Sequence, residues 1–143
     1  MFRDEEYIKQ LIKLLESDKR AVMFYMAFEL AVPVFTIKDL AFGQSALAST
    51  DAAAFATKLV LVTSLALFLM AALFHWLYWR RIHLNEFAVS RILLSGTGEQ
   101  ARELVFGERT GLWGRHGWKY IAGHVALGFG MVTYLAFFAI TIF

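Results

Sequence analysis

Residues 21–42, "AVMFYMAFELAVPVFTIKDLAF", decide the fold because they form a long apolar run near the start of the chain. A helix rises 1.5 Å per residue, so about 20 apolar residues cross a hydrocarbon core of about 30 Å. The run contains one glutamate, Glu29, and the only proline of the chain, Pro33. It therefore predicts a transmembrane helix with an acidic side chain inside it.

The rest of the chain extends this prediction. Of 143 residues, 59% are hydrophobic and 18% charged, and the mean hydropathy is +0.55. Such a chain is more apolar than an ordinary soluble domain. Two further apolar runs, about 56–79 and 118–143, are long enough to span a bilayer. We therefore expect an all-α integral membrane protein with three transmembrane helices, forming one membrane domain over 1–143.

Lysine and arginine predict the orientation of these helices. Five of these basic residues lie in residues 1–20 and seven in residues 80–119, whereas residues 39–58 between the first two spans hold only Lys58 and are preceded by Lys38. Basic residues favour the cytoplasmic side of a membrane. We expect a multi-pass protein of the cell (inner) membrane with a cytoplasmic N-terminus and a C-terminus on the opposite side.

The expected cytoplasmic segments are themselves helical. In residues 1–20 apolar side chains recur at helical spacing, which predicts an amphipathic helix on the inner surface or continuous with the first span. The loop 80–117 should extend the second helix until the sequence "SGTG" ends it. Thr97 and Gln100 then form a capping box that opens another helix, and Gly107 closes that helix.

Glu29 is the first candidate functional residue. It lies about 12 Å beyond Ala21 along a helix, deep in the expected bilayer, where a charged side chain is costly. Pro33 has no N–H to donate to the carbonyl of Glu29, and Tyr25 and Thr36 lie on the same helical face. One interpretation is a protonated glutamate bonded to a neighbouring helix, with Pro33 as a tolerated kink. The other is a hydrated path or a cation or proton site.

Two histidines form a second candidate site. His75 and His124 occupy the inner ends of antiparallel spans at similar expected depth. Imidazoles on different helices can clamp a haem b, and they can bind a quinone headgroup or relay protons with Glu29. Alternatively, histidines beside tyrosine and tryptophan belong to an aromatic belt at the membrane surface.

Small residues predict where helices pack. The third span carries Ala122, Ala126 and Gly130 at four-residue spacing, and the second carries Thr57, Ser64 and Ala71 at seven-residue spacing. Small residues let helix backbones approach closely. We expect both seams and Glu29 to be buried by association, either with further copies in a homo-oligomer or with other membrane subunits.

Several chemistries lack their sequence signals. The chain has no cysteine, no zinc-binding spacing and no phosphate-binding loop, so we expect neither an enzyme nor a metal site. Acidic residues are interleaved with the basic ones, so no nucleic-acid partner is expected. The favoured function is an oligomeric channel or pore for ions or protons, including a membrane-disrupting effector, without a cofactor. The alternatives are a redox-complex anchor that binds haem b or quinone, and a purely structural transmembrane subunit.

Overall fold

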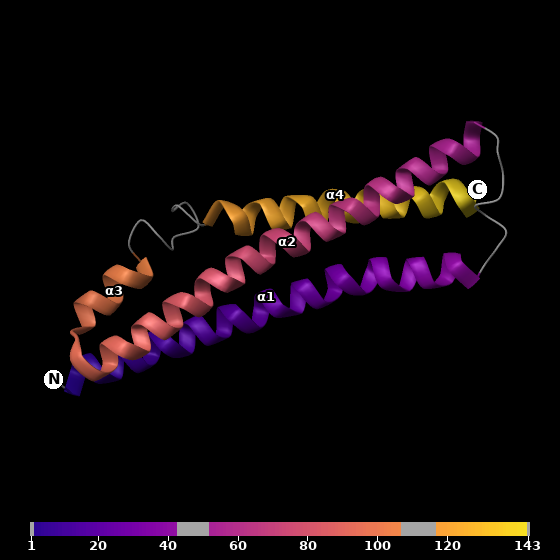
Figure 1. Ribbon diagram of the computed structural model, residues 1–143. Coiled ribbons are helices and arrows are strands. Elements are labelled where there is room, and N and C mark those ends of the chain that lie inside the picture. The colour runs from indigo at the N-terminus through magenta and orange to yellow at the C-terminus, as the bar shows by residue number, and fades with distance from the viewer. Residues whose placement is uncertain (1, 43–51, 107–116, 143) are drawn as a thin grey trace. The chain divides into compact units, whose positions relative to one another are not determined.

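The computed structural model describes residues 2–42, 52–106 and 117–142, which form helices with a short turn at Gly96 and Thr97 and no strand among them (Figure 1). The elements are α1 (Phe2–Phe42), α2 (Ala52–Ser95), α3 (Gly98–Phe106) and α4 (Gly117–Ile142). Helices α1, α2 and α4 are each long and apolar enough to cross a membrane. Over the described residues, the prediction of an all-α protein with three such helices is confirmed.

The helix boundaries follow local sequence signals. Helix α1 joins the amphipathic segment 1–20 to the first apolar run without a break, which was one of the two predicted arrangements. Helix α2 continues past the second apolar run to Ser95, as predicted. The residues from 43 to 51 and from 107 to 116, including Gly107 and part of the predicted helical loop, lie outside the described residues.

The turn between α2 and α3 is built as the sequence predicts. The N–H of Gly96 donates to the carbonyl of Ile92 at 2.7 Å. A Cβ atom at Gly96 would overlap the Ile92 side chain and lie 2.8 Å from Gln100 Oε1, so this turn has room only for glycine. The capping box is present: the N–H of Thr97 donates to Gln100 Oε1 at 3.1 Å, and the N–H of Gln100 donates to Thr97 Oγ1 at 3.4 Å.

Packing within the predicted single domain forms two compact units. We call Met1–Tyr25 with Phe74–Ala122 the charged unit, and Met26–Leu73 with Gly123–Phe143 the apolar unit. Helices α1, α2 and α4 contribute residues to both units, whereas α3 belongs to the charged unit alone.

The charged unit has a hydrophobic core of its own. The core joins α1, α2 and α3 and consists of Ile8, Leu11, Leu15, Val22, Ile82, Val89, Ala101 and Val105. Helix α3 approaches α1 closely, because a Cβ atom at Gly98 would lie only 3.0 Å from Asp4 Oδ1. The glycine therefore lets the first turn of α3 pack against the start of α1.

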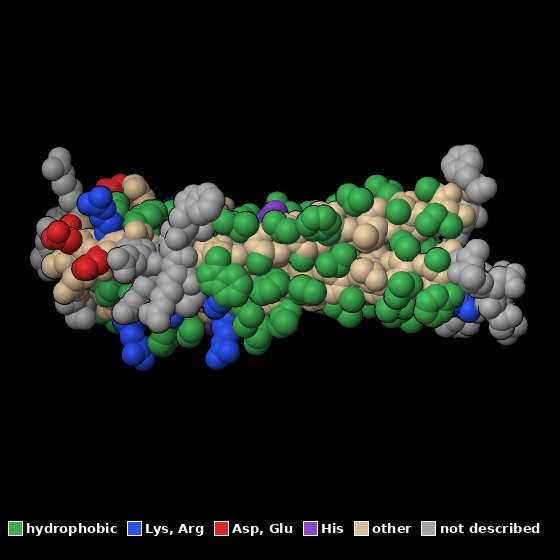
Figure 2. Space-filling view, turned by 90° about the horizontal axis from the view of Figure 1, so that it is seen from above, with side chains coloured by type: hydrophobic (Ala, Val, Ile, Leu, Met, Phe, Trp, Pro, Cys, Tyr) green, Lys and Arg blue, Asp and Glu red, His purple; other side chains and the backbone are tan. Residues whose placement is uncertain are grey.

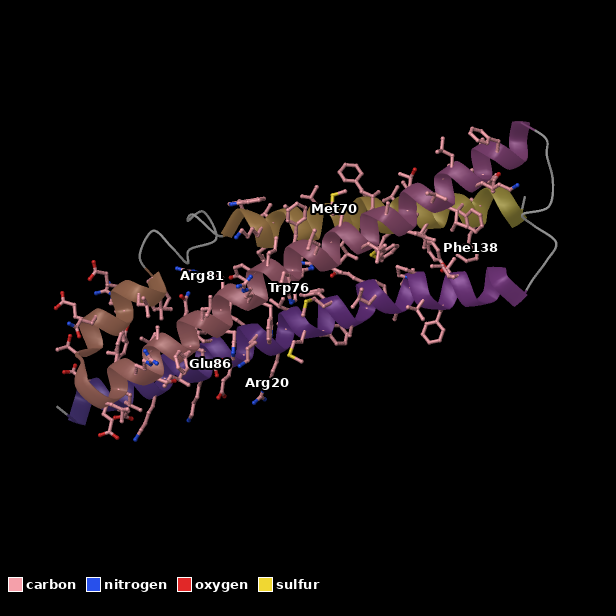
Figure 3. The ribbon with its side chains drawn as sticks, viewed as in Figure 1. Arg20, Met70, Trp76, Arg81, Glu86 and Phe138 are labelled. Atoms are coloured by element: carbon pink, nitrogen blue, oxygen red, sulfur yellow. The ribbon has the colours of Figure 1, made fainter. Side chains whose placement is uncertain are left out.

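Ion pairs lie around this core. Lys19 of α1 donates to Glu86 of α2, and both side chains are largely buried, at 21% and 18% exposed. The other pairs are more exposed. Lys9 lowers the pKa of the exposed Glu5 carboxyl, and Arg20, 82% exposed, extends away from the helices (Figure 3). The pair between Lys19 and Glu86 thus links α1 to α2 in a partly buried position.

The apolar unit turns large hydrophobic side chains outward, and its visible surface is mostly hydrophobic (Figure 2). Phe35, Val62 and Val132 are each more than 60% exposed, whereas Glu29, Thr36 and Ser64 are buried. This arrangement is the reverse of a soluble protein and suits a unit surrounded by lipid, where polar side chains face protein.

The buried residues of α1 and α2 recur mostly three, four or seven positions apart, which places them along one side of each helix. In α2 they are Leu61, Ser64, Phe68, Ala71, Ala72, His75, Ile82, Asn85 and Val89. In α1 the buried residues at seven-residue spacing are Ile8, Leu15, Val22, Glu29 and Thr36. This spacing is that of a coiled-coil seam. Glu29 and His75 therefore occupy positions that apolar residues fill elsewhere on the same helices.

Candidate functional site

Glu29 is fully buried in the apolar unit, with a relative exposure of 0%. Helix α1 continues through Pro33, which is also buried, and Pro33 supplies no N–H to the carbonyl of Glu29. The structure thus places a carboxyl group in the interior of an apolar helix bundle. This burial is achieved within one chain, so a second copy is not required to remove Glu29 from lipid.

Thr36 lies two turns after Glu29 on the same face of α1 and is also buried. Its hydroxyl Oγ1 is 2.6 Å from the hydroxyl of Tyr134 in α4, a direct hydrogen bond in which either oxygen can donate. The Tyr134 ring meets Phe68 of α2 and Phe138 of α4 edge to face, and Figure 3 labels Phe138 on α4. Hydroxyl groups and aromatic rings therefore share the interior of this unit.

A second polar contact joins α2 to α4. The carbonyl of Gly130 accepts a hydrogen bond from Ser64 Oγ at 2.9 Å and another from Thr133 Oγ1 at 3.0 Å. Ser64 itself is fully buried. Such bonds satisfy hydroxyl groups that would otherwise lose a partner on burial.

The predicted small-residue seams face the interior of the same chain. A Cβ atom at Gly130 would lie 3.4 Å from both Leu67 Cβ and Phe68 Cδ2, so α4 and α2 are in close contact there. Ala126, Ser64 and Ala71 are buried, and Ala122 and Thr57 are half-buried. Ser64 of α2 and Gly130 of α4, one residue from each seam, thus contact each other within a single chain. Whether copies associate through other surfaces stays a prediction.

The charged unit holds a different group of residues around His75. This imidazole is fully buried, stacks on the ring of Tyr25 at 5.6 Å and meets the ring of Tyr120 at 5.8 Å. Tyr25, predicted to share a pathway with Glu29, therefore packs against His75. His124 is half-buried and belongs to the apolar unit. Because the two histidines lie in different units, their joint ligation of a haem stays a prediction.

Sequence reasoning missed one group of residues in the charged unit. A cavity of about 190 Å³ is lined by Asp18, Ala21, Val22, Tyr78 and Tyr120, which come from α1, α2 and α4. The rings of Tyr78 and Tyr120 lie 5.0 Å apart. A usable signal was present, since Asp18 follows Leu11 by seven residues and so places a carboxylate in line with the buried stripe of α1.

Neither a cluster of metal-binding side chains nor a known relative was found that bears on the function of the described residues. Over residues 2–42, 52–106 and 117–142, no three histidine or acidic side chains gather where they could hold a metal ion. Comparison with protein-family models, with curated proteins and with solved structures found no match. Only the residues and their geometry therefore indicate what this protein does.

Proposed function

We propose that the chain is a multi-pass protein of the inner membrane that conducts protons through the interior of the apolar unit, with Glu29 as the proton-binding group. The observation that carries this proposal is the complete burial of Glu29 in an apolar helix bundle. The proposed orientation places the N-terminus and residues 80–117 in the cytoplasm, because basic residues are concentrated there.

Burial of a carboxyl group at this position is energetically costly, and a structural role alone does not require it. Ionisable residues inside membrane spans are rare and are commonly found on ion or proton pathways. At the matching positions of α1, one and two heptads earlier, Val22 and Leu15 fill the seam with apolar side chains. A leucine or valine at position 29 would pack similarly, so the carboxyl is better explained by a function that binds or releases a proton.

The neighbouring polar groups favour protons over hydrated cations. Thr36 and Tyr134 are in direct contact at 2.6 Å, which leaves no space for water between their oxygens. Ser64 likewise donates directly to the backbone of Gly130. Hydrogen-bonded hydroxyl groups can pass a proton by exchanging donor and acceptor roles, whereas a hydrated cation would have to separate the helices.

Association with further copies or with other membrane subunits is part of the proposal. The large hydrophobic side chains exposed on the apolar unit offer surface to lipid and to neighbouring helices. Cross-linking of the purified chain in detergent, followed by denaturing electrophoresis, distinguishes a homo-oligomer from a monomer.

Proton flux into liposomes tests the proposed function. The chain is reconstituted with a pH-sensitive dye inside the vesicles, and a potassium gradient with valinomycin drives protons inward. We expect flux from the wild type, its loss in Glu29→Gln, which keeps size and hydrogen bonding, and partial recovery in Glu29→Asp. Glu6→Gln, an exposed glutamate of the charged unit, is the matched control and should conduct normally. Equal flux from the wild type and Glu29→Gln would exclude Glu29 from the pathway, and no flux from the wild type would exclude conduction.

A redox-complex anchor is the second candidate function, and the burial of His75 favours it. A buried imidazole between two tyrosine rings is a potential ligand or hydrogen-bond partner for a cofactor. An absorption spectrum of the purified protein with added haem b tests this candidate, because a Soret band lost in His75→Ala would support it.

A further inference from the structure

The cavity of the charged unit combines a carboxylate with two aromatic rings. Asp18 of α1 is exposed at the cavity, while Tyr78 of α2 and Tyr120 of α4 are half-buried. Val22 is buried and contributes an apolar wall. The lining therefore has one negative charge, electron-rich rings and apolar surface.

This combination suits a cation that carries carbon. Aromatic faces attract ammonium groups, and a carboxylate adds a charge-assisted hydrogen bond to an N–H donor. An anion would be repelled by Asp18, and a strongly hydrated metal ion would find only one carboxylate in the lining. A cavity of about 190 Å³ is large enough for an ethanolamine-sized group.

The charges nearby leave Asp18 available for such a ligand. Lys19, its neighbour in sequence, pairs with Glu86, and Arg20 reaches toward Glu16 at 4.0 Å. Asp18 lies three residues before the apolar run of α1, and partial burial raises the pKa of its carboxyl although the side chain as a whole is exposed. A carboxylate that has lost part of its hydration gains from a cation placed beside it.

We propose that this cavity binds a primary alkylammonium group through Asp18, Tyr78 and Tyr120. Two sources supply that group: the headgroup of phosphatidylethanolamine, since the apolar run of α1 begins at Ala21 beside the cavity, and a soluble amine. The cavity does not include Glu29, so the proposed ammonium binding is independent of the proposed proton conduction.

Native mass spectrometry of the full chain in detergent tests the proposal. The probes are phosphatidylethanolamine and its N-acetylated form, which has the same acyl chains but no ammonium charge. We expect retention of phosphatidylethanolamine only. Asp18→Asn should lower retention about tenfold, as loss of a charge-assisted bond implies. Glu16→Gln removes a carboxylate two residues away and should retain the lipid normally. Competition by free ethanolamine would identify a soluble amine as a ligand, and its absence would assign the site to the lipid.

Two controls keep the result decisive. Helix content measured by circular dichroism must match between the wild type and Asp18→Asn. If Asp18→Asn fails to fold, Tyr78→Leu, which removes one ring, should lower retention in its place. Equal retention of the charged and acetylated lipids, unchanged retention in a folded Asp18→Asn, or binding of neither lipid nor ethanolamine would overturn the proposal.

Discussion

Thr36 Oγ1 and Tyr134 Oη lie 2.6 Å apart and join α1 to α4 by a direct hydrogen bond inside the apolar unit. The two residues are separated by most of the chain, yet each satisfies the other where no water is between them. The contact lies on the same face of α1 as Glu29, so it belongs to the interior that we propose for proton conduction.

Removing either hydroxyl should destabilise the apolar unit. We expect Thr36→Val and Tyr134→Phe each to lower the free energy of unfolding by about 1 kcal/mol, because each leaves a buried hydroxyl without its bond. The double variant should cost less than the sum of the two. Unfolding in mixed micelles measures all three values, and strictly additive losses would show that the bond contributes nothing.

Because α4 closely contacts α2 at Gly130, a larger side chain at this position should strongly reduce stability. A leucine there would collide with Leu67 and Phe68, whose atoms lie 3.4 Å from the position of a Cβ atom. We expect Gly130→Leu to lower the unfolding free energy by about 1–3 kcal/mol, the usual cost of overpacking. The matched control is Gly128→Leu on the same helix, where a Cβ atom meets nothing within 4 Å. Equal thermal stability of the two variants would contradict the packing of α4 on α2.

If the pair between Lys19 and Glu86 is stabilising, exchanging the two charges should restore the stability lost when one of them is reversed. Lys19→Glu should destabilise the charged unit by about 1–3 kcal/mol, because it places two acidic side chains together where both are largely buried. Adding Glu86→Lys should restore most of the loss by reversing the pair. Thermal unfolding followed by circular dichroism measures both variants. If the double variant is no more stable than Lys19→Glu alone, the pair does not hold α1 to α2.

Docking of α3 on α1 depends on the missing side chain of Gly98. In Gly98→Val the new atoms would press on Asp4 Oδ1 and on Tyr7, which lies 3.3 Å from a Cβ atom. We expect α3 to separate from α1 more often, so that limited proteolysis after Gly96 becomes several-fold faster. Arg102→Val introduces the same side chain at an exposed position of α3 and serves as the control. Identical cleavage rates for the two variants would show that Gly98 does not position α3.

The proposed orientation predicts opposite labelling of two engineered cysteines. The chain has no native cysteine, so Ser45→Cys and Ser95→Cys each give a single reactive thiol. A membrane-impermeant maleimide added to intact cells should label position 45, and position 95 should react only after the inner side is opened. Labelling of position 45 only from the cytoplasmic side would reverse the topology.

Local sequence determined the helices of this protein. Long apolar runs predict α1, α2 and α4 because only a helix satisfies its own backbone in lipid. The turn at Gly96 and the capping box of Thr97 and Gln100 act between residues close in sequence, so their prediction needed no tertiary information. The seven-residue repeat that contains Ser64 and Ala71 likewise indicated which face of α2 would be buried.

Only the tertiary structure decided what covers those faces. Helical periodicity places Glu29 and Thr36 on one face, but it does not distinguish a cover made by the same chain from one made by another copy. The structure covers that face with α2 and α4, bringing Tyr134 to Thr36 and Ser64 to Gly130. It also gathers Asp18, Tyr78 and Tyr120 around one cavity. These residues come from three helices. Contacts between helices depend on how side chains of different size fit together in space, and the spacing of residues along one helix does not contain that information.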